Sequence, residues 1–125
     1  MGADLGYIGS AFIATDEARA DHAYKQAIVD NDSQEIVYSN LFTGVHGNYL
    51  KPSIRAAGMD PDNLPESDPS AMNFGSGGDQ DSKAWKDIWG CGQGIGAVKS
   101  ILPTADLVAR LKKEYDAAKA RVLTP

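Results

Sequence analysis

The sequence is poor in the residue types that build disulfides and metal centres. Its 125 residues include one cysteine, Cys91, and two histidines, His22 and His46. A single cysteine cannot form an internal disulfide, and these three residues lack the paired spacing of a zinc site. We therefore predict no metal centre. The cytoplasm is the expected compartment, because disulfide frameworks are typical of secreted chains.

Basic blocks and membrane-length apolar runs are also missing. The formal net charge is −5, whereas a nucleic-acid partner requires a basic face. The apolar run at residues 5–14 is too short to cross a bilayer, and no positively charged region precedes it. We expect no nucleic-acid partner, no membrane partner and no signal peptide. Length and composition fit one ordinary globular domain.

Strand candidates are few. Residues 5–14 are apolar on both parities, interrupted only by Gly6, Gly9 and Ser10, which is typical of a parallel strand buried on both faces. Only four residues precede this run, and the one other good strand candidate is Glu35–Tyr38. One extra strand cannot bury a central parallel strand. The chain is therefore expected to carry one piece of a larger sheet, or to complete its sheet with a second copy.

Helical periodicity is clearer elsewhere. It predicts a helix from Thr15 to about Asn31, with Lys25 outside the packing stripe, and an amphipathic closing helix over residues 103–122. Lys51–Ala57 suits a short helix that ends at Gly58.

Glycine and proline mark the irregular parts. Residues 41–50 contain Gly44 and Gly47, which favour a loop over a helix or a strand. The Pro- and Gly-rich stretch from Asp60 to Ser82 predicts irregular chain, followed by a helical turn that begins at Ser82.

The glycine-rich stretch Gly90–Gly96 nominally satisfies a dinucleotide fingerprint as Gly92-x-Gly94-x-x-Ala97. That motif works only between a strand and a long helix, whereas here a Trp-rich helix precedes it and Pro103 follows too soon. We reject a dinucleotide site. The small residues instead indicate close approach of backbone to backbone or to a flat ligand.

The lone reactive side chains have ordinary explanations. His22 lies beside the apolar stripe of its helix, and a half-exposed surface imidazole is favoured over a catalytic one. His46 is favoured as a loop histidine held by its neighbours over a ligand-facing group. Cys91 has no basic neighbour in sequence, which favours a buried structural thiol over a nucleophile.

Taken in order, several stretches resemble the final third of the nitronate monooxygenases, also called 2-nitropropane dioxygenases. These stretches are Gly2–Asp4 with Gly9–Thr15, then Phe42–Gly44, Gly92–Gly94 and the closing helix introduced by Pro103. That family is an FMN-dependent (β/α)8 barrel. The resemblance implies an α/β fold in which this chain is a C-terminal fragment of the barrel, predominantly helical in isolation. Leu5–Ile8 would be the eighth strand.

The same resemblance divides one partial domain into three parts. Residues 1–31 would hold the last barrel strand and its helix, residues 32–102 an irregular and helical insertion with the Gly-rich loop, and residues 103–122 the closing helix.

The resemblance also implies the site residues. Gly9 and Ser10 would form half of the FMN phosphate cradle, with Gln93 and Gly94 as further flavin-binding residues. Barrels of this class commonly bind phosphate with the loops after strands seven and eight. The family's catalytic histidine lies upstream of the matched part, so no residue here receives the role of the base. We expect weak or absent FMN binding and no turnover of a nitronate by this chain alone.

Two other interpretations stay open. The family also resembles the flavin-dependent enoyl-acyl-carrier-protein reductases, and a non-catalytic oligomeric helical binding module is a further alternative. A strand at Leu5–Ile13 without barrel neighbours would leave open edges and wet apolar faces. We therefore expect a homo-oligomer, most simply a twofold dimer, unless the segment refolds as helix within one chain.

Overall fold

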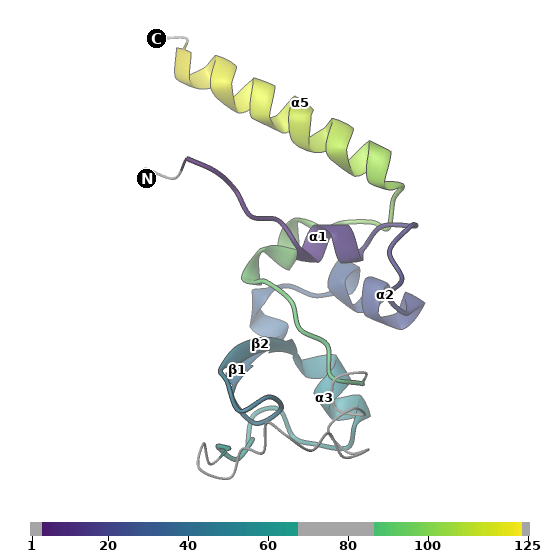
Figure 1. Cartoon of the computed structure of the whole chain (residues 1–125), viewed down its shortest axis with the longest axis vertical. Coiled ribbons are helices and arrows are strands. Elements are labelled where there is room, and N and C mark those ends of the chain that lie inside the picture. The colour runs from purple at the N-terminus through teal and green to yellow at the C-terminus, as the bar shows by residue number, and fades with distance from the viewer. Residues whose placement is uncertain (1–3, 68–86, 124–125) are drawn as a thin grey trace.

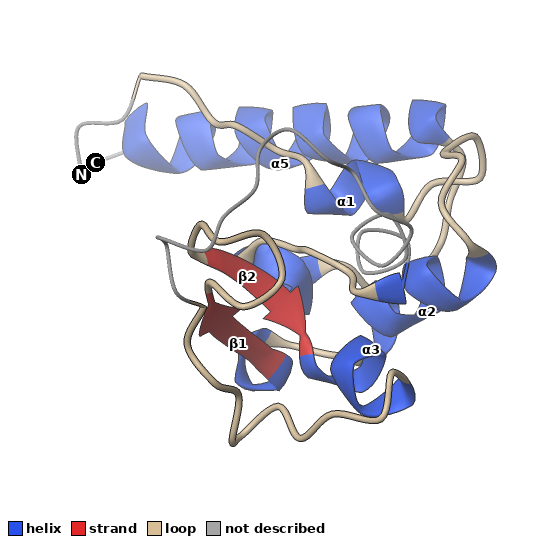
Figure 2. Cartoon of the chain, turned by 60° about the horizontal axis from the view of Figure 1, so that its bottom comes forward, coloured by secondary structure: helices blue, strands red, loops and turns tan. Residues whose placement is uncertain are grey.

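The computed structural model describes residues 4–67 and 87–123 (Figure 1). Figure 2 shows a small two-stranded sheet with short helices around it and one long helix along an edge of the molecule. The elements in chain order are α1 (Ser10–Ile13), α2 (His22–Asp30), the 3-10 helix η1 (Ser33–Glu35), β1 (Ile36–Ser39), β2 (Gly47–Leu50), α3 (Lys51–Ala56), the 3-10 helix η3 (Gln93–Ala97) and α5 (Thr104–Leu123).

The sheet is a hairpin. β1 and β2 pair antiparallel with Ile36 opposite Leu50 and Ser39 opposite Gly47. The strand expected at Glu35–Tyr38 is confirmed within one residue, whereas the loop expected over residues 41–50 is wrong at its end. Residues 47–50 form β2, in which the Tyr49 ring makes an edge-on contact with the Phe42 ring, with 5.0 Å between the ring centroids. Such cross-strand and aromatic packing is what stabilises a hairpin of this length.

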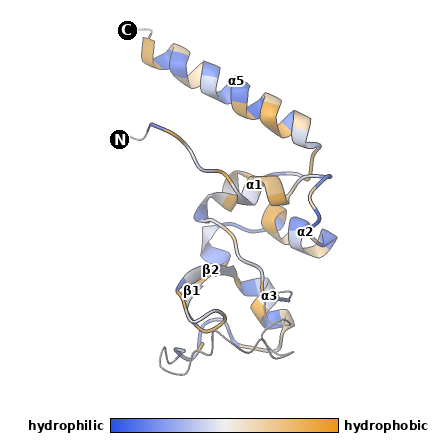
Figure 3. Ribbon diagram, in the orientation of Figure 1, coloured by the Kyte–Doolittle hydropathy of each residue, from blue (hydrophilic) through white to orange (hydrophobic). Residues whose placement is uncertain are grey.

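The core lies between α2, β2 and η3. Its fully buried side chains include Ile28, Leu50 and Ile95, each at 0% exposure, packed with Ala14, Cys91 and Val98. A second cluster of Tyr49, Ile54 and Ile88 lies under α3. Figure 3 shows apolar residues alternating with polar ones along α5.

The strand expected at residues 5–14 is not formed. Residues 5–9 have no regular secondary structure, and Ser10–Ile13 is a short helix, α1. Leu5 is 92% exposed and Tyr7 is fully exposed. A strand needs hydrogen-bonding neighbours on its edges, and within residues 4–67 and 87–123 the only sheet is β1–β2. The described part of the chain therefore contains no barrel, and the expected alternative of helix within one chain is confirmed for residues 10–13.

The helix expected from Thr15 to Asn31 begins only at His22, as α2. The residues before it form a turn in which Thr15 pairs with Leu102 in an isolated parallel bridge. Lys25, expected outside the packing stripe, is buried instead. Its ammonium group donates to the carbonyl oxygens of Thr15 at 2.6 Å and Asp16 at 3.2 Å.

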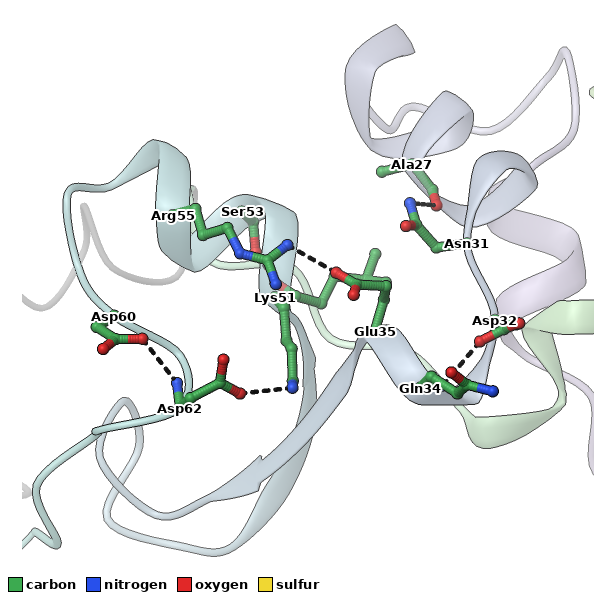
Figure 4. A network of polar contacts seen from close by, with 11 residues as sticks. Ala27, Asn31, Asp32, Gln34, Glu35, Lys51, Ser53, Arg55, Asp60 and Asp62 are labelled. Carbon is green, nitrogen blue, oxygen red and sulfur yellow. Dashed lines mark hydrogen bonds and ion pairs between the residues drawn. The ribbon is translucent and has the colours of Figure 1, made fainter.

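The remaining helices agree better with the sequence. α3 covers the predicted Lys51–Ala57 within one residue, and Gly58 ends it with φ +82°. Figure 4 shows the ion pairs that tie α3 to its neighbours, Arg55 to Glu35 at 2.7 Å and Lys51 to Asp62 at 2.6 Å. α5 covers the predicted closing helix, with Leu107 as its buried residue. The helical turn expected from Ser82 lies outside the described residues, as does most of the irregular stretch expected over residues 60–82.

Replacing Lys25 with methionine should destabilise the fold. Methionine keeps most of the side-chain volume but leaves the buried Thr15 carbonyl without its donor, which typically costs about 1–3 kcal/mol. Lys99→Met is the matched control, because Lys99 is exposed and surface changes usually stay within about 0.5 kcal/mol. Urea unfolding at one fixed protein concentration measures both. Equal midpoints for the two variants would show that the Lys25 contacts contribute nothing.

Candidate functional site

The structure brings together two stretches that lie 82 positions apart in sequence. The hydroxyl oxygen of Ser10 accepts a hydrogen bond from the backbone N–H of Gly92 at 2.7 Å. Ser10 begins α1, and Gly92 precedes η3. The expected cradle residues Gly9 and Ser10 therefore adjoin the start of η3, which carries Gln93 and Gly94.

The backbone on both sides of this contact is accessible. A Cβ atom added to Gly9 or to Gly94 would meet no heavy atom within 4 Å. At Gly92 an added Cβ would lie 3.4 Å from the Ser10 hydroxyl oxygen, an ordinary van der Waals contact. Gln93 is exposed. A ligand group can approach the main chain at Gly9 and Gly94 without meeting a side chain.

The hydrogen-bonding state of Ser10 suits an anionic ligand. A hydroxyl has one proton to donate and two lone pairs to accept with. Since its oxygen already accepts from Gly92, the proton stays available for an acceptor such as a phosphate oxygen. The accessible backbone of Gly9 next to it adds room for that group. The residues at this contact thus fit a phosphate. The Gly92 N–H cannot donate to it, because that N–H already donates to Ser10.

Aromatic packing fixes the loop before Gly92. The ring of Trp89 stacks on Tyr24 with 5.1 Å between centroids and 11° between planes. The Tyr24 hydroxyl donates to the Gly90 carbonyl, and the Cys91 N–H donates to the Asn48 carbonyl at 3.2 Å. Sequence reasoning missed this support. Nothing in the spacing of Tyr24 and Trp89 along the sequence indicates that the two rings meet.

Cys91 and Tyr24 do not ionise near neutral pH. Burial raises the pKa of the Cys91 thiol to about 11. Burial, with a smaller contribution from the neighbouring Cys91, raises the pKa of Tyr24 to about 12. A thiol with so high a pKa is a poor nucleophile at pH 7. The interpretation of Cys91 as a buried structural thiol is therefore supported.

The two histidines lie on the surface. His22 is exposed at the start of α2. His46 is exposed just before β2, where its ring stacks on Tyr38 with 4.8 Å between centroids. Neither has a carboxylate partner among the contacts of the described residues. Within those residues, no three histidine, cysteine or acidic side chains gather as a metal site would require.

The stacked pair also lines a hollow of about 530 Å³. Its other lining residues include Tyr49, Arg19 and Asp21. That volume falls within the range of small-molecule pockets. Its lining shares no residue with the Ser10–Gly92 contact.

Across the described residues, no helix has both the length and the apolar character needed to span a membrane. No protein-family model matches the chain. No solved structure matches it either.

A curated relative does match. Over 120 aligned residues the chain is 28% identical to a protein of Paraburkholderia phytofirmans named nitronate monooxygenase. The match covers 91% of this chain but 32% of the relative, so the chain spans about a third of the relative's length. The resemblance inferred from Gly9–Thr15 and Gly92–Gly94 is thereby confirmed: along nearly its whole length, this chain is similar to part of a nitronate monooxygenase.

Proposed function

We propose that this chain forms part of the flavin phosphate site of an FMN-dependent, nitronate monooxygenase-like oxidoreductase, and that it is inactive alone. The observation that carries the proposal is the 2.7 Å hydrogen bond from the Gly92 N–H to the Ser10 hydroxyl oxygen. It joins the two stretches for which the sequence implied flavin contact. The similarity to a nitronate monooxygenase over 91% of the chain supports the same assignment.

The proposed roles follow from the chemistry of each residue. The Ser10 hydroxyl donates its free proton to a phosphate oxygen, and Gly9 lets the phosphate approach the main chain. Gly94 gives the same access from η3, and the exposed Gln93 side chain offers both an amide donor and an acceptor. Flavin bound there would carry electrons from a nitronate to oxygen.

The proposed inactivity rests on the missing base. A neutral nitroalkane must first lose a proton from carbon to become a nitronate, and this needs a positioned group within hydrogen-bond reach of that carbon, with a pKa near the working pH. The two histidines of the chain, His22 and His46, are both exposed surface residues. Cys91 and Tyr24 stay protonated at neutral pH, since the pKa of Cys91 is about 11 and that of Tyr24 about 12.

FMN should bind weakly and through its phosphate. We expect a dissociation constant on the order of 1 mM, about 4 kcal/mol of binding free energy, because this chain supplies only part of the site. Riboflavin, which lacks the phosphate, should not bind measurably. Quenching of flavin fluorescence follows both titrations, and inorganic phosphate should displace FMN.

Gly9→Val tests the position of the phosphate. Its side chain would occupy the open space at Gly9 and should abolish FMN binding. Gly6→Val is the matched control, because an added Cβ at Gly6 also meets nothing within 4 Å, but Gly6 lies in the segment before α1. Equal binding of FMN and riboflavin, equal FMN binding by the two variants, or no binding up to about 10 mM would contradict the assignment.

The purified chain should not oxidise a neutral nitroalkane, even with FMN added in excess. Without a base, removal of the carbon-bound proton lacks the 10²–10⁴-fold contribution that general acid–base catalysis typically supplies. Oxygen consumption with 2-nitropropane, compared with free FMN at the same concentration, gives the readout. A rate above that of free FMN which is lost in His22→Ala or His46→Ala would show that a surface histidine acts as the base.

A further inference from the structure

The hollow lined by the stacked Tyr24–Trp89 pair combines aromatic side chains with one charge of each sign. Its large apolar and aromatic lining residues are all buried or half-buried: Tyr24, Tyr49, Ile88 and Trp89. Arg19 and Asp21 line the same hollow and are exposed. Small-molecule pockets are typically built in this way, from apolar and aromatic groups with a few polar groups that fix the orientation of the ligand.

The aromatic part of the hollow is held in place by hydrogen bonds of the chain itself. The Trp89 N–H donates to the Ser53 hydroxyl oxygen at 3.1 Å, and the Trp89 carbonyl accepts from the Leu50 N–H at 2.8 Å. The Trp89 ring stacks on Tyr24, whose hydroxyl donates to the Gly90 carbonyl. Because these rings are already fixed, a ligand that packs against them orders little of the protein, and this preorganisation favours binding.

The two charged side chains of the hollow are free to bind a ligand. Asp21 is the N-cap residue of α2, where an aspartate ordinarily accepts hydrogen bonds from the N–H groups of the first turn. Its carboxylate makes no such bond. Neither Arg19 nor Asp21 has an ion pair or a side-chain hydrogen bond with the other, or with any further residue that the structure describes.

The spacing of these charges indicates the class of ligand. Since Arg19 and Asp21 are two residues apart, their Cα atoms are separated by at most about 7 Å. A carboxylate and an ammonium group carried on one carbon atom fit between them, the carboxylate toward the guanidinium group and the ammonium group toward the Asp21 carboxylate. A ring in the same molecule packs against the Tyr24–Trp89 pair in the offset or edge-on geometry that aromatic groups prefer. A free aromatic amino acid carries all three groups.

We propose that this hollow binds a free aromatic amino acid. Its ring packs on Tyr24 and Trp89, its carboxylate pairs with Arg19 and its ammonium group pairs with Asp21. A site that presents both signs of charge favours a zwitterion over a molecule with a single charge. The lining of the hollow shares no residue with the Ser10–Gly92 contact, so the proposal does not depend on flavin binding.

Three probes that differ by one group test this assignment. L-phenylalanine carries the ring and both charges, 3-phenylpropionate lacks the ammonium group, and phenethylamine lacks the carboxylate. We expect L-phenylalanine to bind the wild-type chain with a dissociation constant on the order of 1 mM. Each other probe should bind about three- to fivefold more weakly, the upper part of the range for an exposed ion pair. NMR titration follows the indole N–H of Trp89, whose signal is assigned by its loss in Trp89→Phe.

Two variants should each remove one of these differences. Arg19→Gln should bind L-phenylalanine and phenethylamine equally, whereas Asp21→Asn should bind L-phenylalanine and 3-phenylpropionate equally. Both replaced side chains are exposed, and asparagine caps a helix as well as aspartate does, so the fold should be kept. The matched controls are Arg121→Gln and Asp4→Asn, which change exposed residues outside the lining of the hollow and should keep the wild-type ratios.

Three results would each overturn the proposal. These are a Trp89 signal that does not shift up to about 10 mM L-phenylalanine, equal binding of the three probes by the wild-type chain, and wild-type ratios in either Arg19→Gln or Asp21→Asn. Because the titrations contain no flavin, a failure here is distinct from a failure of the FMN titration.

Discussion

The buried ammonium group of Lys25 holds the turn on which the other parts of the molecule depend. Lysine is rarely buried without a carboxylate. Here the ammonium group instead donates hydrogen bonds to two main-chain carbonyls, those of Thr15 and Asp16. Fixing these carbonyls fixes the backbone between α1 and α2. The same backbone then pairs with Leu102, and the neighbouring Glu17 carboxylate accepts from the N-terminus of α5. One side chain thus determines how the first and last thirds of the chain meet.

The proposed phosphate site depends on the same turn. α1 ends one residue before it, where the Thr15 hydroxyl donates to the Phe12 carbonyl at 2.8 Å. This contact orients α1 and therefore the Ser10 hydroxyl at its start. On the other side, the Gly90–Gly92 backbone is held by Tyr24, which comes from the same helix as Lys25. α2 therefore positions both halves of the Ser10–Gly92 contact. A site built on loops gains its geometry from such supporting contacts.

The sequence predicted the elements whose pattern is local and missed those that depend on distant partners. α5 and α3 follow from apolar spacing with a proline near the start, and Gly58 ends α3 because glycine readily adopts φ +82°. β2 was missed, since a strand of four residues with two small or polar positions has no clear alternation and forms only by pairing with β1. Lys25 was misplaced for a related reason: helical periodicity assigns a lysine to solvent, and only the carbonyls at the preceding turn show why it is buried.

The resemblance identified the residues of the candidate site, but it could not indicate that Ser10 and Gly92 are in contact. Their separation in sequence does not predict this contact, because the chain between them forms most of the core. The apolar run before Ser10 is the opposite case, in which the sequence predicts an element that the structure does not contain. Its composition favours a buried strand, but a strand is stable only when other strands satisfy its backbone groups. Within the described residues no such strand lies beside it, so Leu5–Ile8 has no regular secondary structure and the residues that follow form α1. Gly9 then lies at the start of this helix, with φ −113° and ψ −56°.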